Sequence, residues 1–255
     1  MNIGLENSIK EFIRYTEKYD LDNEHIKGKQ EHSLRVMEIS KQIAEGLILS
    51  QEEIDLATII GLLHDIARFE QYTKYNTFRD LESIDHGDLG AKILQKDIRK
   101  YIRTNKYDKI IIKAVKNHNK YKIEESITEK EELFAKIVRD ADKIDIFYES
   151  VVMFWKGKEQ EVEESILSKD VLEQFEDFVQ VKQKKDESAI DNIIKVIAFI
   201  FDMNFKSSFQ ILKEEDYINK ILNRYNLKDE YTKQKVEEVR KRANEYVRQK
   251  VKGES

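Results

Sequence analysis

Five histidines occur in this chain, and four of them lie on segments that we expect to be helical: His32, His64, His86 and His118. Asp65 follows His64 directly, and a later apolar segment carries Asp140 and Asp142. Neutral imidazole and carboxylate groups are ordinary ligands for Mn, Fe, Ni, Co, Zn and Mg ions. These residue types therefore indicate a site for a divalent metal. The fifth histidine, His25, lies in a polar stretch and is expected at the surface.

The adjacent pair His64 and Asp65 restricts where such a metal could lie. The residues before the pair are apolar, so the segment is expected to be buried. Neighbouring side chains on a helix point about 100° apart, so both can reach one ion only at a helix end or over the backbone. A buried aspartate without a partner is costly, and a metal explains both side chains together.

Each of these residues also has a simpler interpretation. His64 could be a hydrogen-bonded histidine of the core, with Asp65 paired to Arg68, and His32 could lie on an exposed helix face. A helix C-terminus favours His118 through the helix dipole, whatever its function. Taken singly, these interpretations are as good as the metal site. Taken together, four histidines and the His-Asp pair ahead of an acidic helix favour the metal site.

The segments that must bring these ligands together are predicted to be helices. Apolar residues recur at spacings of three and four, and the chain has no proline to break helices. Ser50 with Glu53, and Thr128 with Glu131, form capping-box patterns. We expect loops at 70–83 and 156–165. We expect helices over 5–13, 34–47, 50–67, 86–94, 108–118, 128–144, 168–181, 189–212, 215–225 and 229–251.

The fold class is therefore all-α, a multi-helix bundle in which separate helices meet around the ligands. The charged stretch near 157–167 is the best candidate for a domain boundary in the 255-residue chain. It divides a core, 1–157, from a helical extension, 158–255. The last helix has an apolar stripe and a charged face. It packs on the core in the simplest interpretation and forms a homodimer contact in the alternative.

Composition excludes several classes of protein. The chain has no cysteine, which rules out disulfides and thiolate metal sites. Its net charge of −5 does not favour nonspecific binding to nucleic acid. No apolar stretch approaches the roughly 20 residues that a membrane span requires, and the first residues do not form a signal peptide. We therefore expect a cytoplasmic protein with no nucleic-acid partner and no membrane association.

Three segments resemble the HD superfamily of metal-dependent phosphohydrolases: EHSLRV, GLLHDIARFE and IVRDADKID. The family pattern is a histidine, a later His-Asp pair and a distal aspartate. It falls here on His32, on His64 with Asp65, and on Asp142, for which Asp140 is the rival. The resemblance covers roughly 25–150 and implies an HD-like helical fold for that part of the chain.

Some branches of that family carry two further histidines in this interval and bind a second metal. His86 and His118 match them, which implies one or two divalent ions (Mn, Fe, Ni, Co, Mg or Zn) with Asp65 bridging two. In the alternative, the two histidines line the pocket and contact substrate phosphate. The branch with a Gly-Tyr-Pro signature is excluded, because the chain has no proline.

The resemblance implies hydrolysis of a small phosphorylated substrate, with a nucleotide as the expected case, through metal-activated water. Asp65, Arg68 and Lys143 are the predicted catalytic residues. The two cations would hold phosphate oxygens, although surface salt bridges are the commoner fate of such side chains. The aromatic residues of 69–78 could stack on a base or pack into the core.

Two other functions remain open at this point. The first is a non-catalytic HD module that senses a nucleotide or metal and signals through its C-terminal helices. The second is a helical interaction protein whose histidines are structural. Metal analysis of the purified protein tests the second, and a phosphoester hydrolysis assay separates an enzyme from a sensor.

Overall fold

The structure is a computed structural model, and it describes residues 3–153, 156–182 and 187–253. Within these ranges every regular element is a helix and there is no strand, which confirms the predicted all-α class. The chain divides into two compact units, Met1–Asp142 and Lys143–Ser255. This division falls inside a helix and ahead of the boundary expected at 157/158, which stays a prediction.

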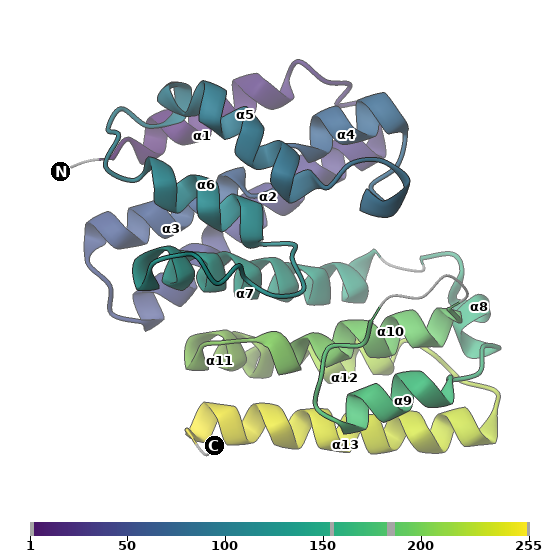
Figure 1. Cartoon of the computed structure of the whole chain (residues 1–255). Helices are drawn as coiled ribbons and strands as arrows, with labels where there is room; N and C mark the ends of the chain where they lie inside the picture. The colour runs from purple at the N-terminus through teal and green to yellow at the C-terminus, as the bar shows by residue number, and fades with distance from the viewer. Residues whose placement is uncertain (1–2, 154–155, 183–186, 254–255) are drawn as a thin grey trace. The chain divides into compact units, whose positions relative to one another are not determined.

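The first unit holds most of the predicted site residues. Its helices run from purple to teal in Figure 1 and are α1 (Leu5–Thr16), α2 (Glu24–Gly46), α3 (Gln51–Leu63), α4 (Arg68–Tyr75), the 3₁₀ turn η1 (Asp80–Glu82), α5 (His86–Tyr101), α6 (Asp108–Asn117) and the first part of α7 (Glu129–Val152). Helix α2 packs along α3, α5 packs along α6, and α1 contacts both α3 and α5.

The contact between α2 and α3 is close because of a glycine. A Cβ atom on Gly61 would collide with Oγ of Ser40 and would lie 2.8 Å from the carbonyl oxygen of Val36. Val36 on α2 is buried, and so are Ile60 and Leu62, the neighbours of Gly61 on α3. Glycine therefore lets the two backbones approach each other at the level of the helix end that carries His64.

Several predicted helix ends are confirmed. Glu53 accepts hydrogen bonds from the backbone N–H and the hydroxyl of Ser50, at 3.2 and 2.7 Å, as the capping-box pattern predicts. The Asp85 side chain accepts from the N–H of Asp88 and opens α5, which extends beyond the predicted end to Tyr101. Helix α3 ends at Leu63, earlier than predicted, with His64 as its C-cap.

The loop predicted at 70–83 is wrong in its first half, because α4 occupies Arg68–Tyr75. Phe69 is fully buried and its ring lies 6.0 Å from the ring of Phe12, and Gln71 is also fully buried. Tertiary packing therefore stabilises a helix that the polar and aromatic composition did not indicate. Asn76 ends this helix in a left-handed conformation, with φ of 52°.

The second unit contains the end of α7 and shorter helices: α8 (Glu159–Glu163), α9 (Lys169–Glu176), α10 (Ala189–Ile197), the 3₁₀ segment η2 (Ala198–Asp202), α11 (Lys206–Glu214), α12 (Tyr217–Leu222) and α13 (Glu230–Lys252). The loop predicted at 156–165 therefore contains a short helix. The helix predicted over 189–212 is three elements.

Helix α13 packs against α10, α11 and α12 of its own unit. Its apolar stripe is covered there, since Val236, Val239, Ala243 and Val247 are buried. The helix therefore packs within the extension itself, and both its packing on the core 1–157 and the homodimer contact stay predictions. No helix in the described part of the chain combines the length and the apolarity that a membrane crossing needs.

Candidate metal centre

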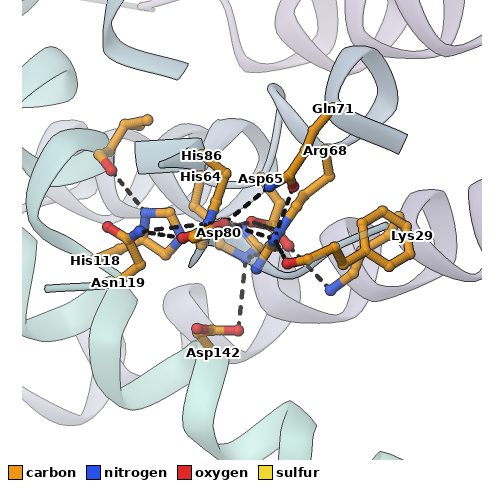
Figure 2. Close-up of polar contacts among 12 residues, drawn as sticks. Lys29, His64, Asp65, Arg68, Gln71, Asp80, His86, His118, Asn119 and Asp142 are labelled. Atoms are coloured by element: carbon orange, nitrogen blue, oxygen red, sulfur yellow. Dashed lines mark hydrogen bonds and ion pairs between the residues drawn. The ribbon is translucent and has the colours of Figure 1, made fainter. Parts of the chain in front are cut away.

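The predicted ligands of the first unit converge on one place, although they come from five helix regions. They are His32 within α2, His64 and Asp65 at the end of α3, His86 at the first residue of α5, His118 at the C-cap of α6, and Asp142 on α7. Figure 2 shows five of these side chains pointing toward one another. The four histidines and Asp65 are buried, and the side chain of Asp142 is 20% exposed.

One group of ligand atoms surrounds His32. Its Nε2 lies 3.1 Å from Nε2 of His64, 3.2 Å from Oδ1 of Asp142 and 3.5 Å from Oδ2 of Asp65. The ligand atoms of His32, His64 and Asp142 all lie within 4.8 Å of one another, so they could hold one ion. Asp142, rather than its predicted rival Asp140, therefore places its carboxylate in this group.

A second group forms on the other oxygen of Asp65. Nε2 of His86 lies 3.0 Å from Nε2 of His118, and each nitrogen lies 3.5 Å from Oδ1 of Asp65. The carboxylate thus presents Oδ2 to His32 and His64, and Oδ1 to His86 and His118. A carboxylate shared in this way can contact two separate cations.

His64 and His118 are held by the same device. Each follows the last residue of a helix, and its Nδ1 lies 2.7 Å from the carbonyl oxygen three residues earlier, on Gly61 and Val115. A carbonyl oxygen can only accept, so Nδ1 carries the proton and Nε2 keeps its lone pair. The two rings satisfy carbonyl groups that a helix end would otherwise leave unpaired. The His-Asp pair thus lies at a helix end, which is one of the two placements that the angle between adjacent side chains allows.

His86 is oriented by a residue that the sequence did not suggest. Its Nδ1 lies 2.8 and 2.7 Å from the two carboxylate oxygens of Asp80, so Nδ1 is again the donor. Its Nε2 and that of His118 therefore face each other as two acceptors, 3.0 Å apart. No hydrogen bond can form between two lone pairs, whereas a cation would be attracted by both. The donor set thus fits a divalent metal.

The electrostatics keep these groups in the forms that a metal needs. Burial lowers the pKa of His64, and burial together with the charge of Arg68 lowers the pKa of His86 to about 4. Burial alone would raise the pKa of Asp65, but Lys29, His64 and Arg68 hold this pKa well below its ordinary value. His64 and His86 are therefore neutral, and Asp65 is ionised, at neutral pH.

Two cations flank Asp65. Nε of Arg68 lies 3.3 Å from Oδ1 and Nζ of Lys29 lies 3.2 Å from Oδ2. Nη1 of Arg68 is engaged by the carbonyl oxygen of Phe78 at 2.7 Å and by Oδ1 of Asp80 at 3.3 Å. Among the described residues, Nη2 of Arg68 has no hydrogen-bond acceptor.

The third predicted catalytic residue, Lys143, belongs to the second unit. It is buried, and its ammonium group pairs with Asp202 at 2.8 Å. A contact of Lys143 with substrate phosphate therefore stays a prediction. Lys29, which is not among the predicted catalytic residues, is the lysine that the structure places beside Asp65.

Sequence analysis also missed Arg139, which closes the end of α6. Arg139 is buried and Nη1 donates to the carbonyl oxygens of Asn117, His118 and Lys120. It precedes Asp142 by three residues, so both project from one face of α7. That spacing is the signal that could have drawn attention to Arg139, whereas the carbonyls that it binds are visible only in the structure.

The aromatic residues of 69–78 could stack on a base or pack into the core, and the structure places Phe69 apart from Tyr72 and Phe78. Phe69 belongs to the core with Phe12, Tyr15 and Tyr19. The rings of Tyr72 and Phe78 pack against each other, with centroids 4.8 Å apart. Phe78 also lies beside Lys29 and Arg68, whose charged groups are each 5.6 Å from its ring centroid.

An all-helical unit with four imidazoles and two carboxylates at one place defines a candidate divalent-metal protein. Residues 30–146 match the model of the HD domain, and this part of the chain therefore belongs to the HD-domain superfamily. The six converging residues all lie within the matched range. HD domains bind divalent metals and are generally metal-dependent phosphohydrolases. No curated protein and no solved structure matched the chain.

Proposed function

We propose that this protein is a metal-dependent phosphohydrolase that uses two divalent cations to cleave a phosphoester bond in a small molecule. The observation that carries the proposal is the pair of opposed Nε2 lone pairs on His86 and His118, beside a carboxylate whose second oxygen faces His32 and His64. Membership of the HD-domain superfamily supports the phosphoester as the bond that is cleaved.

In this proposal, His32, His64, Asp65 and Asp142 hold one cation, and His86, His118 and Asp65 hold the other. Divalent cations in such a site supply Lewis-acid charge neutralisation and lower the pKa of water. The protein contributes buried imidazoles, and those of His64, His86 and His118 are oriented by contacts at Nδ1, so little reorganisation is needed when an ion binds.

Lys29 and Arg68 are proposed to neutralise the oxygens of the substrate phosphate. In phosphoryl transfer the protein acts mainly by positioning and charge stabilisation, which suits two cations beside the ligand cluster. Nη2 of Arg68 could donate a hydrogen bond to a phosphate oxygen. The side chain of Lys29 is 20% exposed, so its ammonium group could be reached by a substrate. Lys143 is kept as a further proposed phosphate contact.

The substrate is proposed to be a nucleotide. The ring pair Tyr72 and Phe78 adjoins Lys29 and Arg68, so a flat base and a phosphate could be bound by neighbouring groups. The acidic net charge of −5 argues for a small phosphorylated molecule rather than a nucleic-acid polymer.

The test is hydrolysis of a panel of nucleotides, sugar phosphates and synthetic phosphodiesters by chelator-treated protein reloaded with Mn²⁺, Co²⁺, Ni²⁺ or Mg²⁺. Asp65→Asn and His64→Ala should lose at least about 100-fold of the rate, as expected for loss of a metal ligand or its oriented partner. Asp55→Asn is the matched control, since this carboxylate on α3 accepts a local hydrogen bond from Gln51 at 2.8 Å.

Equal rates in His64→Ala and the unaltered protein would show that the hydrolysis comes from a contaminant. Tight binding of Mn²⁺ without turnover of any substrate would instead support the non-catalytic HD module. Protein that binds no divalent cation would overturn the metal-dependent hydrolase and a module that senses a metal.

A further inference from the structure

We propose that Asp80 is the positioning residue that creates the second cation site, by fixing the proton of His86 on Nδ1. The inference rests on the proposed function, because it concerns the cation held by His86 and His118. Its basis is a difference between His86 and the other two oriented histidines of the cluster.

His64 and His118 use carbonyl groups of their own helices, because each stands at a helix end. His86 is the first residue of α5, so no preceding turn of that helix can offer a carbonyl to it. The acceptor for Nδ1 of His86 therefore has to come from outside the helix. Asp80, in the turn η1 six residues earlier, supplies both carboxylate oxygens at 2.7 and 2.8 Å.

Asp80 is itself fixed by three side chains from other elements. Nε2 of Gln71 donates to Oδ1 at 2.9 Å, Nη1 of Arg68 lies 3.3 Å from Oδ1, and Nδ2 of Asn119 donates to Oδ2 at 3.1 Å. Gln71 is fully buried and also donates to the carbonyl oxygen of Ile84 at 2.9 Å. Figure 2 shows Asp80 at the centre of these contacts.

The consequence is chemical as well as geometric. A neutral imidazole carries its proton on either nitrogen. Without the carboxylate at Nδ1, the proton of His86 can move to Nε2, where it would form a hydrogen bond to His118 and close the position meant for a cation. Asp80 thus keeps the lone pair on the side of the ligand cluster. A carboxylate that orients a metal-binding histidine also raises the basicity of the ligand.

Equilibrium dialysis with Mn²⁺ tests the proposal. Asp80→Asn retains the size of the side chain but leaves one oxygen for four converging donors. We expect one Mn²⁺ to bind 10- to 100-fold more weakly and the other to bind as before. Glu82→Gln is the matched control, because Glu82 lies in the same turn and pairs with Arg79 at 2.9 Å. Asp80→Glu should recover part of the lost affinity.

Nitrogen NMR of the metal-free protein supplies a second measurement that a merely structural role would not change. His86 should carry its proton on Nδ1 in the unaltered protein and shift toward Nε2 in Asp80→Asn, while the His64 and His118 tautomers stay the same. Equal weakening of both Mn²⁺ sites, or two unchanged affinities with an unchanged His86 tautomer, would overturn the role of Asp80. An unaltered protein that binds fewer than two Mn²⁺ ions would overturn the dinuclear proposal itself.

Discussion

Nε2 of His86 and Nε2 of His118 lie 3.0 Å apart, and each ring gives its single proton to a group on its opposite side. The acceptors are the carboxylate of Asp80 and the carbonyl of Val115. The two facing nitrogens therefore repel each other until something positive lies between them. This repulsion destabilises the fold locally, and the same arrangement of lone pairs provides a binding site for a cation.

We expect divalent cations to stabilise the folded protein. At a free Mn²⁺ concentration of 100 times the dissociation constant, one site should add about 2.7 kcal/mol to the free energy of unfolding. Urea titrations with chelator and with Mn²⁺ measure this difference. His118→Ala should show a smaller gain than the unaltered protein. The same gain in His118→Ala would show that the stabilising ion is bound elsewhere.

The metal-free protein should lose stability as the pH falls from about 6.5 to about 4. The pKa of His86 is lowered from 6.5 to about 4 in the fold, so in this interval the unfolded chain binds the additional proton. The free energy of unfolding should decrease by roughly 1 to 3 kcal/mol across it. Urea titrations in chelator at several pH values test this. His86→Gln should give a shallower slope, and a flat profile in the unaltered protein would contradict the prediction.

Two glycines in neighbouring helices should respond oppositely to alanine. Gly61→Ala forces a Cβ against Ser40 and Val36, and we expect a loss of about 1 to 3 kcal/mol of stability. Gly28→Ala places its Cβ in open space on α2, so it should gain about 0.5 to 1 kcal/mol. Chemical denaturation compares the two directly. Gly61→Ala should also weaken Mn²⁺ binding, since α2 carries His32 and α3 ends at His64.

Substitution by asparagine at the strained position after α2 should stabilise the protein. Ile48 has φ of 56°, a conformation that β-branched residues rarely adopt, and its side chain is 91% exposed. Asparagine tolerates this conformation, so Ile48→Asn should stabilise the protein by about 0.5 to 1 kcal/mol. Thermal unfolding measures the gain. A lower melting temperature would show that the exposed Ile48 side chain makes a contribution that this argument omits.

The ligand cluster could be predicted to a large extent because its members carry their chemistry in their residue types. The angle between adjacent helical side chains allowed an ion shared by His64 and Asp65 only at a helix end or over the backbone, and His64 is the C-cap of α3. The groups that orient the ligands could not be predicted. Asp80 lies in an irregular turn without periodicity, and its contact with His86 depends on where α4 and α5 are placed by tertiary packing.

For the helices too, locally determined features could be predicted from the sequence and features determined by tertiary packing could not. The capping pair Ser50 and Glu53 located the start of α3, because a cap is a local interaction. The break between α10 and α11 contains no proline or glycine that would have predicted it from the sequence. Residues 198–202 turn into a 3₁₀ segment whose Ala198 and Ile200 are buried, and burial of this kind is decided by partners distant in sequence.

The hydrogen bonds from His64 and His118 to the carbonyls at the ends of α3 and α6 have a kinetic consequence. Because both rings are already oriented by the fold, capture of an ion requires no rotation of either side chain. The entropic cost of ordering the two side chains has then been met during folding and does not oppose ion binding. The slow event should then be the shedding of water by the ion. Mg²⁺, which dehydrates reluctantly, should therefore load more slowly than Mn²⁺ in stopped-flow experiments, even where the two reach similar occupancy.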